Sequence, residues 1–289
     1  MRIALTGASG ILGEGLIARS ARAGHEIVPV PRAQLQADPK ALRVFFSGVD
    51  AVIHAAANTN VEACELDPST CYRDNLLLTD QLAEVCLLES RKLVFISSTG
   101  VYGSRKKEPY AEYEAADPPT HHHRAKHLAE SAVLAFSRRN LVLRTGWLFG
   151  GDPRKPKNFV ARRLEEANEA LKMGRHELAA NPLQRGNPTF TEDLADRLFE
   201  ALEHDDSGVF NAVNSGSVSR LEYVQAILEA AGLLLRAVPP SADAGFKRVA
   251  LVSPNECALN WRFEALGYAQ MPDWRHSLNR YIATLGALR

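Results

Sequence analysis

Short apolar runs alternate with amphipathic stretches along the first half of the chain. Apolar runs at residues 3–5, 26–30, 51–54, 92–96 and 141–144 have the length of buried strands, and the stretches 14–23, 69–89 and 120–137 show helical character. Strands that alternate with helices need a parallel sheet with helices on both faces. The pattern therefore predicts an α/β fold with a doubly wound parallel sheet.

The second half of the chain loses this alternation beyond Gly150. Polar, proline-rich segments at 152–158 and 181–188 separate helical stretches at 159–172, 192–203 and 221–231. We interpret these helices as a smaller lobe that closes the substrate side of the sheet. Residues 1–150 then form a first domain, and residues 151–289 form mainly a substrate-binding lobe, with strands or helices that can return to the sheet.

A glycine turn joins the first predicted strand to the first helix. Gly7 suits a tight turn, Gly10 lets backbone approach a pyrophosphate, and Gly13 lets the helix pack closely on the strand. The free N–H groups of the helix would point at the phosphates. This strand–turn–helix context predicts a Rossmann-type dinucleotide-binding domain. The predicted cofactor contacts in this turn are Gly7, Ser9, Gly10, Ile11, Leu12 and Gly13.

The end of the second predicted strand bears on the choice of cofactor. NAD-binding sites usually place an acidic residue there to hold the ribose 2′-hydroxyl, whereas this chain reads Val30-Pro31-Arg32 with no acid before Asp38. The planar fork of Arg32 can bind a 2′-phosphate. We therefore expect NADP to be preferred to NAD, the alternative being that Arg32 is an ordinary surface residue.

The ends of the next two strands supply further candidates. Ala55, Ala56 and Ala57 have small side chains that would let backbone lie against the cofactor, and Ser98 follows the buried run 92–96. Ligands bind at the carboxyl ends of parallel strands, which places the Ser98 hydroxyl for chemistry. The charged, proline-containing segment 104–119 is predicted to be a flap over this crevice.

Charge and cysteine content narrow the class of partner. The chain has 34 basic and 34 acidic residues, interspersed, so it has no basic field for nucleic acid or an anionic membrane. The four cysteines show neither metal-ligand spacing nor a pairing pattern, which fits a reducing compartment. We expect a cytoplasmic protein without signal peptide or membrane span and with a small-molecule partner.

Besides the three glycines, Ser98 and Lys126, several short segments in a fixed order are informative: residues 54–62 (HAAANTNVE), 143–147 (LRTGW), 158–159 (NF), 184–189 (QRGNPT), 266–268 (LGY) and 272–274 (PDW). With these residues the chain resembles the extended short-chain dehydrogenases/reductases, and more narrowly the dTDP-4-dehydrorhamnose reductase family. The resemblance implies a Rossmann-type sheet with a C-terminal substrate lobe, NADP or NAD as cofactor, and reduction of a keto group on a nucleotide-activated deoxysugar. A homodimer or a protein partner stays open.

One position departs from the family pattern. The family uses a Ser or Thr, a Tyr four residues before a Lys, and that Lys; here Ser98 and Lys126 match, and His122 stands at the Tyr position. By the resemblance, Lys126 holds the nicotinamide ribose, Ser98 orients the carbonyl and residue 122 donates the proton. The catalytic candidates are therefore Ser98, His122 and Lys126, with Lys126 also a cofactor contact.

Three outcomes compete at position 122. An imidazole can donate a proton near neutral pH, although it is shorter than a phenol and a neighbouring lysine disfavours its charged form. Alternatively the protein has lost catalysis and serves as an NADP-binding regulatory or partner-binding subunit. In the third outcome Tyr102, Tyr110 or Tyr113 donates the proton from the loop.

The histidine run also raises the question of a metal. His123 and His127 are four apart, the spacing of paired zinc ligands on a helix. No third ligand stands out nearby, and consecutive helix residues face different ways. We therefore predict no metal site.

Overall fold

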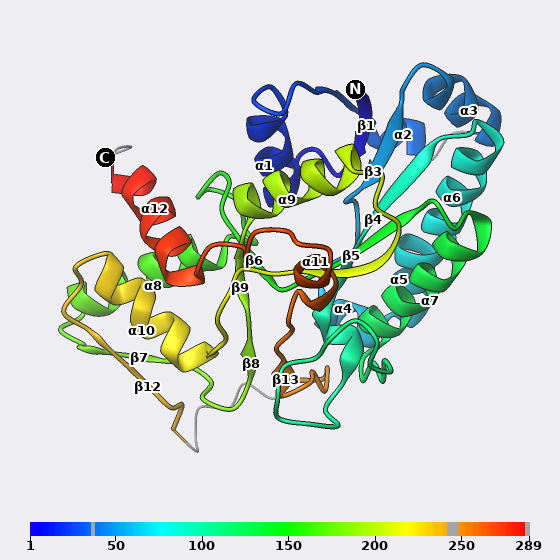
Figure 1. Ribbon diagram of the computed structural model, residues 1–289. Helices are drawn as coiled ribbons and strands as arrows, with labels where there is room; N and C mark the ends of the chain where they lie inside the picture. The colour runs from blue at the N-terminus through cyan, green and yellow to red at the C-terminus, as the bar shows by residue number, and fades with distance from the viewer. Residues whose placement is uncertain (36–37, 242–247, 287–289) are drawn as a thin grey trace.

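A six-stranded parallel sheet forms the centre of the molecule in the computed structural model, which describes residues 1–35, 38–241 and 248–286 (Figure 1). The strand order is β10-β5-β4-β3-β1-β2, with every neighbouring pair parallel. The order reverses at β1 and β3, the switch point of a doubly wound fold. The strands are β1 (Arg2–Thr6), β2 (Glu26–Pro29), β3 (Ala51–His54), β4 (Lys92–Ser98), β5 (Leu141–Thr145) and β10 (Gly208–Ala212).

Helices cover both faces of this sheet, as the alternation of strands and helices predicts. One face packs against α1 (Ile11–Ser20) and α9 (Thr191–Glu203). The other packs against α3 (Pro39–Ser47), α6 (Leu78–Leu88) and α7 (His121–Phe136). Between these lie shorter helical segments: α2 (Arg32–Leu35), α4 (Val61–Leu66), α5 (Pro68–Tyr72), a π-helical segment η1 (Arg73–Leu77) and a 3₁₀ segment η2 (Thr99–Tyr102).

Two predicted helix boundaries differ from those observed. The first helix starts at Ile11, directly after the glycine turn, because Gly10 already has the extended backbone of an N-cap residue. The helical stretch predicted at 69–89 is real but contains the π-helical turn Arg73–Leu77. Apolar spacing cannot reveal a π turn, since one extra residue only rotates the pattern.

The stretch 192–203 does not belong to the lobe, so that expectation was wrong. Helix α9 packs against α1, with Leu194, Leu198 and Phe199 fully buried in the cluster that covers the sheet. Strand β10 then pairs with β5 and becomes the edge of the sheet. The second half of the chain therefore crosses back to complete the first domain.

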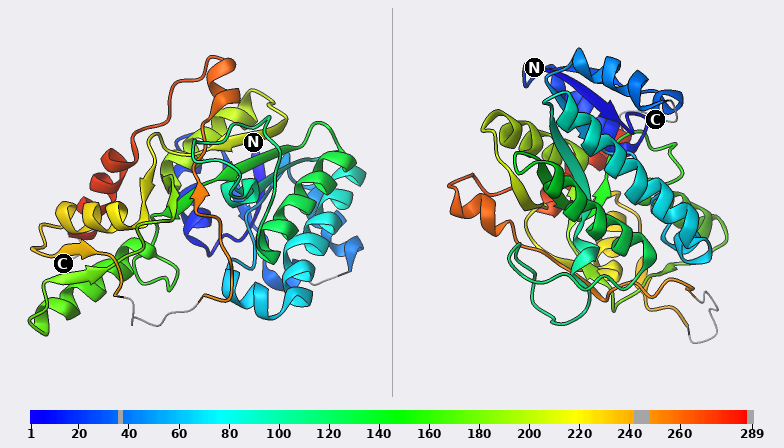
Figure 2. Two further views of the ribbon diagram at one scale, coloured as in Figure 1. Left: turned by 90° about the horizontal axis from the view of Figure 1, so that it is seen from below. Right: turned by 90° about the vertical axis from the view of Figure 1, so that its right-hand side faces the viewer.

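Most of the remaining second half forms the smaller lobe. It projects to one side of the sheet in Figure 1 and in the left view of Figure 2. Its apolar centre includes Phe149, Tyr223 and Trp274. The lobe contains β6 (Trp147–Phe149), β7 (Glu177–Ala179), β8 (Arg185–Gly186), β9 (Pro188–Phe190), β11 (Val218–Ser219), β12 (Arg236–Val238), β13 (Asn255–Glu256), α8 (Phe159–Lys172), α10 (Arg220–Ala230) and α12 (Trp274–Gly286). Helix α11 (Trp261–Ala265) instead packs against β10, with Phe263 buried in the cluster that covers the sheet.

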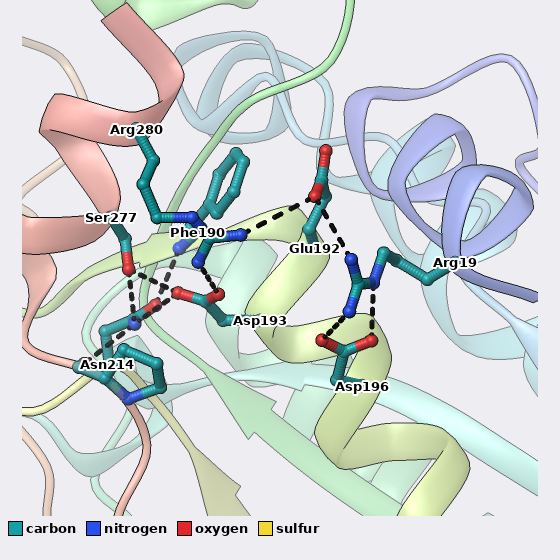
Figure 3. A network of polar contacts seen from close by, with 9 residues as sticks. Arg19, Phe190, Glu192, Asp193, Asp196, Asn214, Ser277 and Arg280 are labelled. Atoms are coloured by element: carbon teal, nitrogen blue, oxygen red, sulfur yellow. Dashed lines mark hydrogen bonds and ion pairs between the residues drawn. The ribbon is translucent and has the colours of Figure 1, made fainter. Parts of the chain in front are cut away.

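A polar network ties the last helix to the sheet domain (Figure 3). On α9, Asp193 accepts hydrogen bonds from Asn214 (2.8 Å) and Ser277 and forms an ion pair with Arg280 of α12 (2.9 Å). Further along α9, Asp196 receives two hydrogen bonds of 2.6 Å from Arg19 of α1. Helix α9 thus joins the lobe to the helix that follows the glycine turn.

Two further observations bear on the sequence-based expectations. In the described ranges no helix combines the length and apolar character needed to cross a membrane. All four cysteines are buried free thiols.

Candidate active site

The glycine turn has the geometry that a dinucleotide-binding turn requires. Gly7 has a φ of +73°, and a Cβ there would lie 2.6 Å from Ala56 N. At Gly13 a Cβ would lie 2.3 Å from Gly7 O, so only glycine lets α1 start this close to the turn. Gly10 differs, because it is exposed and a Cβ would meet only Gly7 O, at 3.3 Å.

The alanines after β3 are fixed beside this turn. Thr6 Oγ1 accepts a hydrogen bond from Ala56 N (3.1 Å) and contacts His54 Nδ1 at 2.7 Å. The other ring nitrogen of His54 contacts Thr79 Oγ1 at 3.0 Å. Burial lowers the pKa of His54 to about 3, so its neutral ring serves as a structural link. Ala55, Ala56 and Ala57 are each only half-buried, which leaves this backbone accessible.

Arg32 is exposed at the start of α2, directly after the end of β2. Strand β2 pairs with β1, which leads into the glycine turn. Within the part of the chain that the structure describes, no carboxylate forms an ion pair with Arg32. Its guanidinium is therefore available at the strand end where an adenosine ribose lies in dinucleotide folds.

Helix α7 brings Lys126 to the end of β4. Lys126 is 5% exposed, and its Nζ donates a hydrogen bond to Ile96 O (2.9 Å) and lies 4.5 Å from the centroid of Phe95. Burial lowers the Lys126 pKa to about 8. Ser98, two residues beyond Ile96, is half-buried, and its hydroxyl accepts a hydrogen bond from Gly100 N (3.1 Å).

His122 lies one helical turn before Lys126 and is 6% exposed. Its Nδ1 is buried without a hydrogen-bond partner. Burial, together with the charges of His123 and Lys126, lowers the His122 pKa well below its usual 6.5. A buried polar atom without a partner is rare in a folded protein and is typical of a site that receives a ligand.

The three tyrosines of the loop have other partners. Tyr102 is fully buried and donates to Asn211 Oδ1 (2.8 Å), and its ring stacks on that of Tyr110 with centroids 4.8 Å apart. The Tyr110 hydroxyl lies near Gly103 O (3.4 Å), while Tyr113 is 73% exposed and packs on Trp261. Of the candidates for proton donor, His122 is the one on the helix face that carries Lys126.

The predicted flap at 104–119 is anchored by the C-terminal segment instead of lying free. Asn255 Nδ2 donates to the carbonyl oxygens of Lys106 and Glu108, both at 2.9 Å. Tyr110 N donates to Cys257 O (2.8 Å). Prolines and charges predict a flap, but they do not reveal this long-range pairing.

Sequence analysis missed a buried ion pair below the site. Glu130 accepts hydrogen bonds from Arg144 Nε (2.9 Å), Arg144 Nη2 (2.6 Å) and Ser97 Oγ (2.5 Å). These contacts join α7 to β4 and β5 and so hold the part of α7 that carries Lys126 against the sheet. The available signal was spacing, because Glu130 is four residues after Lys126 and shares its helix face.

The segment 150–158, whose part 152–158 was interpreted from the sequence only as a polar, proline-rich separator, crosses from the lobe to the cofactor side. Asp152 N donates to Glu14 Oε2 of α1 (2.7 Å). Lys157 Nζ donates to Thr59 Oγ1 (2.5 Å), beyond the alanines. Two residues of this segment therefore contact helix α1 and the loop after β3, which flank the predicted cofactor position.

The histidines raised as metal ligands have other contacts. His123 Nδ1 contacts Thr120 Oγ1 at 3.0 Å, and its ring fills the space where Gly100 lacks a side chain. His127 Nδ1 contacts Glu130 Oε2 at 3.1 Å. Among the described residues, no three His, Cys, Asp or Glu side chains gather as a metal ion would need.

The fold and these residues together define a class of protein. An exposed cradle at Gly10, bordered by turn positions where a Cβ would clash, fits the backbone approach of a pyrophosphate, and a lysine and a serine follow at the end of β4. These features are those of a Rossmann-fold oxidoreductase of the extended short-chain dehydrogenase/reductase type.

Comparison with known proteins gives the family. The model of the RmlD substrate-binding domain matches residues 1–287, and the chain belongs to this family. The dTDP-4-dehydrorhamnose reductase of Mycolicibacterium smegmatis is 30% identical over 290 residues, covering 98% of this chain and 86% of the relative.

Solved structures agree with this assignment. The crystal structure of a dTDP-4-dehydrorhamnose reductase from Clostridium acetobutylicum superposes with a TM-score of 0.90 at 26% identity, covering 99% of this chain and 100% of that chain. The enzyme of the same name from Bacillus anthracis, solved in complex with NADP, has the same fold, with a TM-score of 0.88 at 24% identity over 98% of this chain and 99% of that chain.

Proposed function

We propose that the protein reduces the 4-keto group of a deoxysugar linked to a nucleoside diphosphate, with NADPH preferred to NADH. The observation that carries this proposal is the placement of Lys126 and Ser98 at the end of β4, with His122 one helical turn before Lys126, in a chain of this family. The M. smegmatis relative is named for a dTDP-linked substrate, and the B. anthracis structure holds NADP.

Each residue has a role that its surroundings support. NADPH, held along the glycine turn, would supply the hydride. Lys126, fixed by Ile96 O, would bind the nicotinamide ribose, and the Ser98 hydroxyl would hold the substrate carbonyl oxygen. His122 would donate the proton to that oxygen through a ring nitrogen that faces no protein partner.

The low pKa of His122 has a direct chemical consequence. At neutral pH its imidazole is mostly uncharged, and the charged form that donates a proton is a minor species. The proposed reaction is therefore expected to be slow at neutral pH and faster in mildly acidic solution.

The test is NADPH oxidation with dTDP- and UDP-linked 4-keto-6-deoxysugars, measured by absorbance. We expect oxidation that depends on the keto sugar, with one nucleotide strongly preferred. NADPH binding without turnover of any of these sugars, together with a stable co-purifying protein, would instead support an NADP-binding partner subunit.

A further inference from the structure

In the lobe, an arginine that forms no ion pair with any described carboxylate lies against two aromatic rings. Arg220 is the first residue of α10, and its guanidinium carbon lies 3.4 Å from the centroid of Trp147 and 5.0 Å from that of Phe159. The residue remains partly exposed, yet its surroundings desolvate it enough to lower its pKa to about 10. Arg220 is therefore largely surrounded by protein but keeps part of its surface accessible.

No side chain in the described residues neutralises this cation directly. No carboxylate oxygen lies within 4.0 Å of the Arg220 guanidinium, and no hydrogen-bond acceptor faces it. The charge of Glu256 acts on Arg220 from further away, because the Glu256 carboxylate accepts the indole N–H of Trp147 at 2.6 Å. The five N–H donors of Arg220 are thus available to a ligand.

Other donors around the same aromatic rings also lack acceptors. Arg163 of α8 lies 5.3 Å from the centroid of Phe159, and its Nε is buried without a partner, although its Nη2 donates to Glu166 (2.7 Å). The ring of Tyr223 stacks on Phe159 with centroids 5.4 Å apart, and its buried hydroxyl has no partner. Unpaired donors that gather in one place favour an anionic ligand.

The chain connects Arg220 and its aromatic neighbours to the candidate active site through Trp147. Ser98 is paired in register with Thr145 at the end of β5, and Trp147 follows two residues later. Residue 147 therefore follows closely on the strand end where the carbonyl would bind, and its buried ring contacts Arg220. In a sugar nucleotide the diphosphate is attached at C1, across the sugar ring from C4. A sugar with C4 at Ser98 would carry its diphosphate on the far side of its ring, for which the lobe that contains Arg220 is the available partner.

We propose that Arg220, held between Trp147 and Phe159, binds the diphosphate of the sugar nucleotide, with Arg163 as an additional cation. The inference rests on the proposed function, since it assumes a substrate of that class. The planar guanidinium can stack on an aromatic ring and still bind phosphate oxygens with two parallel hydrogen bonds, which an ammonium group cannot do equally well.

The test compares Arg220→Gln and Arg220→Lys with the control Arg236→Gln. Arg236 also lies in the lobe, but it is exposed and paired with Glu177 at 2.9 Å. Calorimetry measures the binding of dTDP, of thymidine and of NADPH, and steady-state kinetics gives KM and kcat for the keto sugar. We expect Arg220→Gln to weaken dTDP binding and raise KM by roughly tenfold or more, with kcat, NADPH binding and thymidine binding unchanged. The dTDP affinity and KM of Arg220→Lys are expected to lie between those of the unmodified protein and Arg220→Gln. The control Arg236→Gln is expected to match the unmodified protein.

Two results would overturn the inference. The first is an unchanged dTDP affinity in a folded Arg220→Gln protein. The second is a lower kcat and a lower melting temperature with the dTDP affinity intact, which is what a purely structural stacking role would give. If Arg220→Gln does not fold, Arg220→Lys provides the same comparison. If dTDP binding depends on Arg220 but no keto sugar is turned over, the proposed function is contradicted and the Arg220 site is still supported. Keto-sugar turnover with the same KM in the unmodified protein and in Arg220→Gln would support the proposed function and contradict the Arg220 site.

Discussion

His122 decides how the proposed reaction depends on pH. Its pKa lies below 6.5 because of burial and nearby positive charge, and only its protonated form donates a proton. The rate should therefore rise as pH falls from 8 through the usual histidine range. His122→Ala should reduce kcat by roughly 100-fold or more, the scale of general acid catalysis. The measurement is a pH profile of kcat for both proteins.

The matched variant is His122→Tyr, which restores the residue that the family pattern has at this position. A phenol has an ordinary pKa of about 10 and keeps its proton through neutral pH, so this variant should retain activity at pH 8. An identical pH profile for the unmodified protein, His122→Tyr and His122→Ala would show that His122 is not the donor.

Arg32 is the residue that we expect to set the preference between the two nicotinamide cofactors. Its exposed guanidinium at the end of β2 is placed for a 2′-phosphate. Arg32→Asp should weaken NADPH binding by roughly tenfold or more and favour NADH, because a charge-assisted contact is replaced by repulsion. Fluorescence titration of both cofactors checks this. Equal affinity of the unmodified protein for NADPH and NADH would count against the role.

Single residues were predictable where a motif carried them. Spacing and resemblance pointed to the glycines, Ser98, Lys126 and the histidine in place of tyrosine as candidates, and their roles stay predictions. Arg220 and Glu256 were not, because their significance arises only when Trp147 brings together segments that are far apart in the chain. A motif search cannot find a site assembled by long-range packing.

At the scale of elements, the glycine turn makes a prediction that separates binding from folding. A Cβ at Gly13 would overlap Gly7 O at 2.3 Å, whereas one at Gly10 would meet only that oxygen, at 3.3 Å. Gly13→Ala should destabilise the fold by about 3 kcal/mol or more. Gly10→Val should keep most of the stability and lose cofactor affinity by tenfold or more. Urea unfolding and NADPH titration of both variants test this, and equal effects on both quantities would contradict it.

The elements themselves were largely predictable because strands and amphipathic helices have distinct periods. The five strands expected in the first half are all present in the sheet. The placement of α9 was not predictable, since its apolar face would suit either the lobe or the sheet. Only its contacts with α1 show that it completes the first domain.

At the scale of the whole molecule, buried histidines should make the fold sensitive to acid. The pKa of His54 is lowered to about 3, and those of His122 and His123 are also lowered, each mainly by burial. Below pH 6.5 the unfolded chain therefore binds more protons than the folded one, so stability falls as pH falls. Each such histidine contributes about 1.4 kcal/mol per pH unit in this window.

Urea unfolding at pH 7.5 and 5.5 measures this loss. We expect a lower free energy of unfolding at pH 5.5, and a smaller difference in His54→Gln, which removes one of the three groups. A free energy of unfolding that is constant or higher at pH 5.5 would contradict the account. The same comparison shows whether the protein stays folded where His122 is expected to be most active.

Hydride transfer to the sugar is the central claim, and isotope labelling tests it most directly. NADPH carrying deuterium on the transferable position of its nicotinamide ring is incubated with the protein and a dTDP-4-keto-6-deoxysugar, and the product is analysed by mass spectrometry. The account predicts one deuterium at C4 of the sugar, at a rate that Lys126→Ala abolishes. Bound NADPH and bound sugar nucleotide with no deuterium in any product would contradict it.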